Sequence, residues 1–495
     1  MMRLRLLAGL LTLAPLALAQ AEPPAKLSLK PCRLEHPARI HALPAECAMF
    51  SVPENYDPPD SNEPAGRSIE LFVARVPAIS LNAAKDPLFL IAGGPGGSAV
   101  DMYTAAAAAF ERVRRDRDII VVDQRGTGRS HRLDCPGMDG DLFQKFSEIE
   151  VGPEANRCRD KLLEGSDLRQ YTTSVAVRDL DAVRRALGYA RINLYGQSYG
   201  TRVAQHYARR YPDATRSVIL DGVVDPATVL GPATAVDAER ALERILERCA
   251  KESACADAFK DPFGDYRALR AKLAADPPTV TINDASGKPL QFEFTARHMS
   301  AVLRFASYND DQAALLPLSL HLAAHENNYI PLANQFRVFA RTLDEAFAYG
   351  MHNSVACSED IPLIESGQLD RAALEATHMG AEMVEQLMEA CRDWPRGVVD
   401  ADLHAPLQSK SAALLLSGAD DPVTPPEYAT RAQEAFADSK HLVVAGHGHG
   451  QLIAPCVDRI IASFVAAGTA KDLDTACTEK LRPMPFFITL SGPAP

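Results

Sequence analysis

Short apolar runs alternate with amphipathic stretches along much of the chain. This alternation is typical of buried parallel strands joined by crossover helices. We expect strands at residues 71–76, 88–91, 119–122, 192–195 and 217–220, and again at 412–416 and 441–444. We expect helices at residues 175–187, 201–210, 431–436 and 452–467. The pattern therefore predicts an α/β fold with a mostly parallel, doubly wound sheet.

Residues 226–400 break this alternation and are expected to be mostly helical. Helical composition covers residues 235–249, 266–275 and most of 299–349, while residues 279–294 have the composition of a hairpin around Ser286. A helical insertion between two blocks of one sheet indicates a lid or cap. We therefore expect a cap at 226–400, with the core divided into residues 20–225 and 401–495.

The first residues have the features of a secretory signal peptide. Two arginines precede an apolar run over residues 6–18, and a small-x-small pattern ends at Ala19. A cut after Ala21 fits almost as well. The run is shorter than the roughly 20 apolar residues that span a bilayer, and no other stretch approaches that length. We expect residues 1–19 to be removed and the protein to be secreted or periplasmic, with no membrane insertion.

Ten cysteines in an exported chain favour disulfides over metal ligands. Neither a C-x-x-C motif nor a Cys/His zinc spacing occurs, so we expect no metal and no other cofactor. Many pairings are open to ten cysteines, and the order along the chain favours neighbours. The expected pairs are Cys32–Cys47, Cys135–Cys158, Cys249–Cys255, Cys357–Cys391 and Cys456–Cys477.

Composition and charge narrow the function. The chain has 495 residues, of which 47% are hydrophobic and 23% charged, so it can bury a large core. One large domain with an insertion and two domains are both compatible with this length. The formal net charge of -12, without basic clusters, argues against a nucleic-acid partner.

A Gly-x-Ser-x-Gly motif lies between the expected strand 192–195 and the expected helix 201–210. Gly196 and Gly200 flank Ser198, as in a nucleophile elbow, where the serine projects from a sharp strand-to-helix turn. The alternative is a glycine-rich turn with an idle serine. The strand and helix on either side favour Ser198 as a catalytic nucleophile.

A serine nucleophile needs a base, and the base needs an orienting acid. In α/β hydrolases the acid and then the histidine follow the serine along the chain, at later strand ends. Asp421 follows the strand at 412–416 and is the preferred acid. Asp221 and Asp225, after the strand at 217–220, are the other positions, while Asp420 is expected to be solvated or to support its loop.

Two histidines follow the last expected strand within a glycine-rich loop. We prefer His449 as the base and keep His447 as the alternative, with a supporting role more fitting for it. His206 lies on the helix after Ser198 and is interpreted as an ordinary helix residue.

The oxyanion that forms on acyl transfer must be met by backbone N–H groups. Tyr199 follows the nucleophile at a helix N-terminus and is one expected donor. The second is Gly94, in the glycine-rich run 93–97 that follows the strand at 88–91. That run lacks the Gly-Lys-Ser/Thr of a P-loop, so a phosphate site is disfavoured.

Together these motifs resemble a family, the exported serine exopeptidases of the α/β-hydrolase fold that include proline iminopeptidases and tripeptidyl aminopeptidases. The matching pieces are the glycine run at 93–97, the Asp-Gln-Arg-Gly-Thr-Gly-Arg-Ser stretch at 123–130, the elbow at 196–200, the Asp-Pro-Val-Thr-Pro stretch within 418–425, and Gly-His-Gly at 448–450 followed by Cys456. The resemblance implies Ser198, Asp421 and His449 as a triad beneath a helical cap.

Two details refine the resemblance. Proline iminopeptidases commonly carry histidine where this chain has Ala92, and the C-terminal block resembles the tripeptidyl aminopeptidase branch. Both point to that branch. Arg125, within the 123–130 stretch, is expected to brace the glycine loop rather than to act in catalysis.

The implied substrates are peptides with a free N-terminus, whose ammonium needs a carboxylate. Glu359 and Asp360, beside Cys357, are the most suggestive pair, and a solvated acidic turn is the alternative. A secreted carboxylesterase would use the same triad, and a non-catalytic binding protein is a third reading of the same fold.

Overall fold

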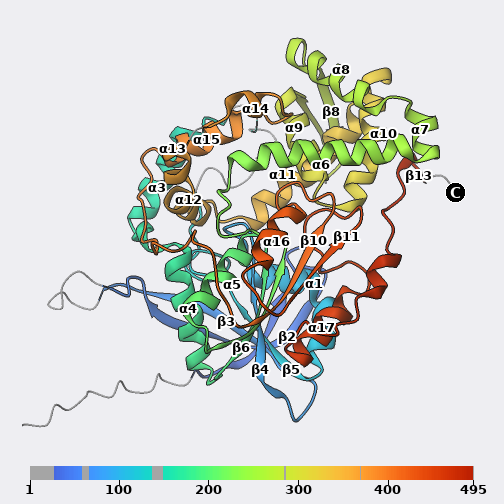
Figure 1. Ribbon diagram of the computed structural model, residues 1–495. Helices are drawn as coiled ribbons and strands as arrows, with labels where there is room; N and C mark the ends of the chain where they lie inside the picture. The colour runs from blue at the N-terminus through green and yellow to red at the C-terminus, as the bar shows by residue number, and fades with distance from the viewer. Residues whose placement is uncertain are drawn as a thin grey trace, which may run out of the picture.

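The computed structural model describes residues 27–57, 66–135, 146, 149–283, 286–367 and 369–493. The expected signal peptide at residues 1–19 lies outside these ranges. Figure 1 shows a sheet flanked by helices, with a second, mostly helical layer covering one end of it.

Within the described ranges, nine strands form one sheet in the order β1-β2-β3-β5-β4-β6-β7-β10-β11. β1, β2 and β3 pair antiparallel, β3 is antiparallel to β5, and the remaining neighbours are parallel. This confirms the predicted mostly parallel sheet. The strands are β1 (Lys30–Glu35), β2 (Ala42–Pro53), β3 (Ser68–Val76), β4 (Ala84–Ile91), β5 (Arg117–Val122), β6 (Ile192–Gln197), β7 (Thr215–Asp221), β10 (Ala412–Gly418) and β11 (Ser439–Val444).

The two outermost antiparallel strands at one side of the sheet, β1 and β2, were not expected from the sequence. Many of their side chains are exposed or only half-buried, so the apolar run that marks a buried parallel strand is missing. The central strands β4, β6 and β10 are buried almost throughout, and each was predicted from its apolar run.

Helices cover both faces of the sheet. α4 (Thr173–Ala186), α5 (Tyr199–Arg210) and α16 (Pro426–Gln433) pack on one face, while α1 (Ala99–Arg114) and α17 (Val457–Ala467) pack on the other. Because crossover helices fall on both sides, the sheet is doubly wound as predicted.

Two predicted helices have different bounds in the structure. α16 ends at Gln433, whereas a helix was expected at 431–436; it begins at Pro426, a residue well suited to a first helical position. α17 begins at Val457 rather than near 452, because Cys456, at its N-terminal end, has a left-handed conformation with φ of 66°.

A mostly helical segment connects β7 to β10, and we refer to it as the cap. The predicted hairpin is present as β8 (Thr279–Asn283) and β9 (Pro289–Glu293). The helices of the cap are α6 (Pro232–Lys251), α7 (Ser253–Phe259), α8 (Pro262–Ala275), α9 (Ala296–Ala306), α10 (Asp310–Glu326), α11 (Ile330–Ala346), α12 (Tyr349–Glu359), α13 (Ile361–Ser366), α14 (Arg371–Glu375) and α15 (Glu382–Cys391).

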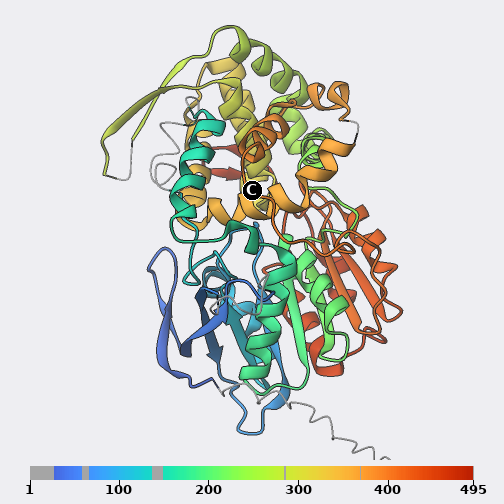
Figure 2. The ribbon, with the colours of Figure 1, turned by 90° about the vertical axis from the view of Figure 1, so that its left-hand side faces the viewer.

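Two further segments pack with the cap. α3 (Val151–Leu163) lies against α15, and Figures 1 and 2 show it among the cap helices. The end of the chain, with β12 (Phe487–Thr489) and β13 (Gly492–Pro493), lies beside α7 and α10, where Phe486 joins a buried cluster with Cys249 and Leu318. The cap layer thus includes parts of both blocks that were assigned to the core.

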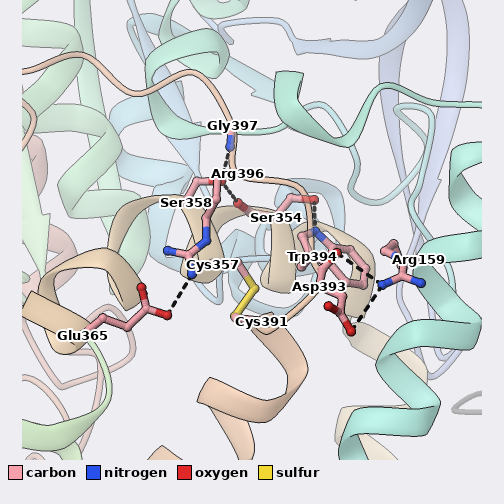
Figure 3. Close-up of a disulfide and its surroundings, with 10 residues drawn as sticks. All are labelled: Arg159, Ser354, Cys357, Ser358, Glu365, Cys391, Asp393, Trp394, Arg396 and Gly397. Atoms are coloured by element: carbon pink, nitrogen blue, oxygen red, sulfur yellow. Dashed lines mark hydrogen bonds and ion pairs between the residues drawn. A yellow bond between two sulfur atoms is a disulfide. The ribbon is translucent and has the colours of Figure 1, made fainter.

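The ten cysteines form five disulfides, and each pairing is the one predicted between sequence neighbours. Cys357–Cys391 joins the last turn of α12 to the end of α15 (Figure 3). Around it, Trp394 donates to the Ser354 hydroxyl at 3.1 Å, and Gly397 N–H donates to Ser358 Oγ at 2.8 Å. These contacts fix α12, which forms one wall of the cavity described below.

Five disulfides are typical of a protein that folds in an oxidising environment. None of the helices in the described part of the chain combines the length and the apolar composition that a membrane crossing requires.

Candidate active site

Ser198 occupies the tight turn between β6 and α5, with φ of 56° and ψ of -125°. A positive φ is strained for a serine and is characteristic of a nucleophile elbow. A Cβ on Gly196 would clash with the backbone of Gly200, and one on Gly200 would clash with the carbonyl of Ile91. Glycine at both positions is therefore what allows the turn to form so close to β4.

His449 and Asp421 lie in contact at the ends of neighbouring strands β11 and β10. The Nδ1 of His449 is 2.8 Å from Oδ2 of Asp421, which is fully buried. Asp421 Oδ1 also accepts the backbone N–H groups of Val423 at 2.9 Å and Thr424 at 2.8 Å. The aspartate is thus held in place from two sides, and it fixes one edge of the imidazole.

The two groups shift each other's pKa in opposite directions. Burial alone would raise the pKa of Asp421, but His449 and the N–H donors outweigh it and hold that pKa below its ordinary value. Burial alone would lower the pKa of His449, but the charge and hydrogen bond of Asp421 outweigh it and hold the pKa above its ordinary value. The imidazole is therefore more basic than a free histidine.

Two contacts of this pair were not foreseen from the sequence. Thr424 Oγ1 donates to Asp421 Oδ2 at 2.8 Å and lies 3.1 Å from His449 Nδ1. The carbonyl of Tyr308 accepts the His449 N–H at 3.0 Å, and its ring packs edge-on against the imidazole with 5.0 Å between centroids. Thr424 lies within the Asp-Pro-Val-Thr-Pro stretch that the sequence analysis singled out. Tyr308 comes from the cap and carries no local sequence signal.

Ser198 and His449 face one cavity of about 780 Å³ between the strand ends and the cap. Among the described residues, the Ser198 hydroxyl has no hydrogen-bond partner, and Asp421 lies behind the cavity wall. In unliganded sites the contact between nucleophile and base is often long, and it shortens only when substrate binds. The structure therefore brings all three predicted residues to one place, with serine and histidine exposed to the cavity.

The glycine loop runs directly beside the elbow. A Cβ on Gly93 would lie 2.8 Å from both Gln197 O and Ser198 Cβ, so the loop backbone touches the turn. Gly94, with φ of 119°, and Tyr199 also line the cavity. The two residues predicted as oxyanion donors thus line the same cavity as Ser198, and their role stays a prediction.

Asp123, rather than Arg125, contacts the start of α1, directly after the glycine loop. Its Oδ1 accepts from Ser98 Oγ at 2.9 Å and from Val100 N–H at 3.2 Å. The prediction that Arg125 braces this loop is wrong. The buried Arg125 guanidinium pairs with Asp179 at 2.6 Å and donates to the Glu54 carbonyl at 2.7 Å, so it joins α4 to the end of β2.

The alternative histidines have other partners. His447 Nδ1 lies 3.0 Å from Asp310 Oδ2, and His447 is not part of the cavity lining. The buried His206 has its Nε2 2.7 Å from Asp400 Oδ2. Neither has the contact with Asp421 that His449 has.

The alternative acids are also engaged elsewhere. Asp225 pairs with Arg431, and Asp420 lies 3.4 Å from Arg248. Asp221 accepts from Tyr195 OH and from Gln451 N–H, both at 2.7 Å. Burial raises the pKa of Asp221 to about 6. It supports the histidine loop through Gln451 but makes no hydrogen bond to His449.

Glu359 and Asp360 are buried and already hydrogen-bonded. Asp360 pairs with both Nη atoms of Arg202 at 3.0 Å and accepts the N–H of Leu230 at 2.8 Å. Glu359 accepts from Thr173 N–H at 2.7 Å and from Arg202 at 3.3 Å. Burial raises the pKa of Glu359 to about 7. Asp360 reaches the cavity lining and Glu359 does not, so ammonium binding by the pair stays a prediction.

One group of side chains in the described residues could hold a metal ion. Asp265 of α8 lies 3.2 Å from His321 Nδ1 and 2.6 Å from His325 Nε2, both on α10. The cluster belongs to the cap and is not part of the cavity lining. The carboxylate satisfies both imidazoles, which joins α8 to α10.

A serine at an elbow and a histidine–aspartate pair at later strand ends, facing one cavity, define a serine hydrolase. The chain belongs to the alpha/beta hydrolase fold family, whose model matches residues 86–454.

The individual proteins that are similar to this chain include both peptidases and an esterase. The chain is 24% identical over 486 residues to the tripeptidyl aminopeptidase of Streptomyces coelicolor, covering 89% of this chain and 84% of that protein. It is 32% identical over 265 residues to serine protease Hip1 of Mycobacterium tuberculosis. That match covers 50% of this chain and 45% of the length of Hip1. It is 34% identical over 249 residues to carboxylesterase B of the same species, covering 47% of this chain and 43% of that one.

Proposed function

We propose that this protein is an exported serine peptidase that releases short segments from the N-terminus of peptides. Ser198 is the nucleophile, His449 the general base and Asp421 the orienting acid. The observation that carries the proposal is the 2.8 Å contact between His449 and Asp421 in the cavity that the strained Ser198 faces.

The chemistry follows from this arrangement. Asp421 occupies Nδ1 of His449, so Nε2 is left to take the proton of Ser198 as its Oγ attacks the peptide carbonyl. The amides of Gly94 and Tyr199 stabilise the oxyanion. His449 then protonates the leaving amine, and the acyl group stays on Ser198. Water, activated by the same imidazole, attacks the acyl-enzyme and releases the segment.

The preference for peptides rests on similarity and on the cap. The similarity to tripeptidyl aminopeptidase extends over most of the chain, whereas the similarity to carboxylesterase B covers about half of it. The cap covers the strand ends, which favours chain termini over internal bonds. A carboxylesterase remains the second candidate, because it would use the same three residues.

Recognition of the substrate's ammonium is assigned to carboxylates of the cavity. Asp360 is the member of the predicted pair that lines it, with Glu359 behind. Asp101 of α1 also lines the cavity, and no cation of the described residues pairs with it. Glu359→Gln and Asp360→Asn should raise KM for free-amine peptides more than for N-blocked esters. An equal effect on both would assign the pair a structural role.

The activity itself can be tested with purified protein. Tripeptidyl and aminoacyl chromogenic amides would be compared with N-blocked amides and short-chain esters, with Ser198→Ala as the control. We expect turnover of unblocked amides by the wild type alone. Turnover of esters only would favour the carboxylesterase, and no turnover of any substrate would favour a binding protein.

A further inference from the structure

In the part of the chain that the structure describes, Arg304 is a cation of the active-site cavity without a carboxylate partner. It lies in the last turn of α9, and its side chain lines the same cavity as Ser198 and His449. Among the described residues, no carboxylate oxygen lies within ion-pair distance of its guanidinium. Nη1 donates to the thioether of Met383 at 3.2 Å, and the buried Nε has no acceptor.

This state is costly for an arginine. A thioether sulfur is a weak acceptor, and a buried donor without a partner loses its hydration with little return. The buried Arg202 shows the usual solution, because Asp360 and Glu359 neutralise its charge. The Phe305 ring, 4.8 Å from the Arg304 guanidinium, and the Tyr308 side chain also contact Arg304, but neither neutralises its charge. We therefore expect a ligand to supply the anionic acceptor.

Arg304 also lies within electrostatic reach of the reacting groups. Its charge opposes the rise in the pKa of His449 and contributes to the low pKa of His352, which burial lowers to about 4. His352 lines the cavity as well, and its Nδ1 is buried without a partner. Two side chains that line the cavity of Ser198 and His449 thus each carry a buried polar atom without a partner.

We propose that Arg304 binds a carboxylate of the substrate next to the scissile bond. The planar guanidinium matches a carboxylate in a two-pronged hydrogen-bonded pair. The carboxylate is either the C-terminus of a short peptide or the side chain of an aspartate or glutamate near the cut. This inference rests on the proposed peptidase function for the identity of the substrate, but the binding step can be measured without turnover.

The test uses matched peptides. One pair differs only in a free C-terminal carboxylate or a carboxamide, and a second pair only in glutamate or glutamine beside the expected cut. Binding is measured by calorimetry on the Ser198→Ala variant and on the Ser198→Ala/Arg304→Gln double variant. The ratio kcat/KM is measured on the wild type and on Arg304→Gln, which both retain Ser198. Arg297→Gln is the matched control, because it removes a guanidinium from the same helix outside the cavity, where Arg297 pairs with Glu382.

We expect Arg304→Gln to weaken binding of one carboxylate peptide by about 10- to 100-fold and to leave its neutral partner nearly unchanged. Arg304→Lys should keep part of the preference, and Arg297→Gln all of it. The peptide pair whose difference in affinity is lost in Arg304→Gln identifies the source of the carboxylate. Equal losses for charged and neutral peptides, or no preference in Ser198→Ala itself, would overturn the proposal. If no peptide is hydrolysed, the peptidase function fails, while the binding comparison still decides the role of Arg304.

Discussion

The carbonyl of Tyr308 in the cap accepts the backbone N–H of His449 at 3.0 Å, and its ring packs against the imidazole. Tyr308 lies between α9 and α10, far along the chain from the histidine loop. Through this contact the cap holds the proposed base in the position that Asp421 requires. The cap therefore takes part in building the site as well as in covering it.

Replacing the Tyr308 ring should disturb the position of His449. Tyr308→Ala removes the edge-on contact, and we expect kcat to fall by roughly 10- to 100-fold with a smaller change in KM, because small misplacements of a base are costly. Tyr308→Phe keeps the ring and should retain most activity. Steady-state kinetics of both variants provide the check, and a Tyr308→Ala enzyme with wild-type kcat would remove Tyr308 as a positioning residue.

The pH dependence of activity follows from the raised pKa of His449. The imidazole acts as a base only when neutral, so a pKa above the ordinary value of about 6.5 means that activity is lost as the pH falls through that higher value. In Asp421→Asn the burial effect is opposed only by the charge of Asp221, so the pKa of His449 should drop and the acid limb should move to lower pH. Residual kcat/KM profiles and the imidazole NMR signal of His449 would test this; an acid limb below pH 6 in the wild type would contradict it.

The close approach of the glycine loop to the elbow predicts a specific loss at Gly93. Its added Cβ would meet Ser198 Cβ and Gln197 O at 2.8 Å, so Gly93→Ala should displace the loop or the serine and abolish most activity. Gly66→Ala is the matched control, since a Cβ there meets nothing within 4 Å. Activity and thermal unfolding would be measured together. A folded and fully active Gly93→Ala enzyme would refute the geometry.

The disulfide between α12 and α15 should contribute more stability than the shortest one. The residues of Cys357–Cys391 are 34 apart in the sequence and those of Cys249–Cys255 are 6 apart. Loop-closure entropy then predicts losses of about 4 and about 2 kcal/mol when each pair is replaced by serine. Chemical unfolding would measure both. The Cys357/Cys391 variant should also lose activity, because α12 lines the cavity; an order of stability reversed between the pairs would contradict the expectation.

Local patterns predicted the α/β fold with its central strands and pointed to the three residues of the proposed triad, which the structure places together. The elbow, the strand ends and the glycine loop each lie within a short stretch, so their residue types and spacing could be interpreted directly. Tyr308 and Arg304 could not be found this way, because their roles depend on where the cap folds back over the sheet. The same reason explains the error at Arg125, whose partners Asp179 and Glu54 lie on distant elements.

The central claim is that Ser198 is the nucleophile of a peptidase. The most direct measurement is to treat the protein with a fluorophosphonate, locate the adduct by peptide mass spectrometry, and follow hydrolysis of an unblocked tripeptidyl amide in parallel. We predict one adduct, on Ser198, with loss of hydrolysis in proportion to labelling, and neither adduct nor hydrolysis in Ser198→Ala. Labelling of another residue, or hydrolysis that persists in Ser198→Ala, would contradict the account.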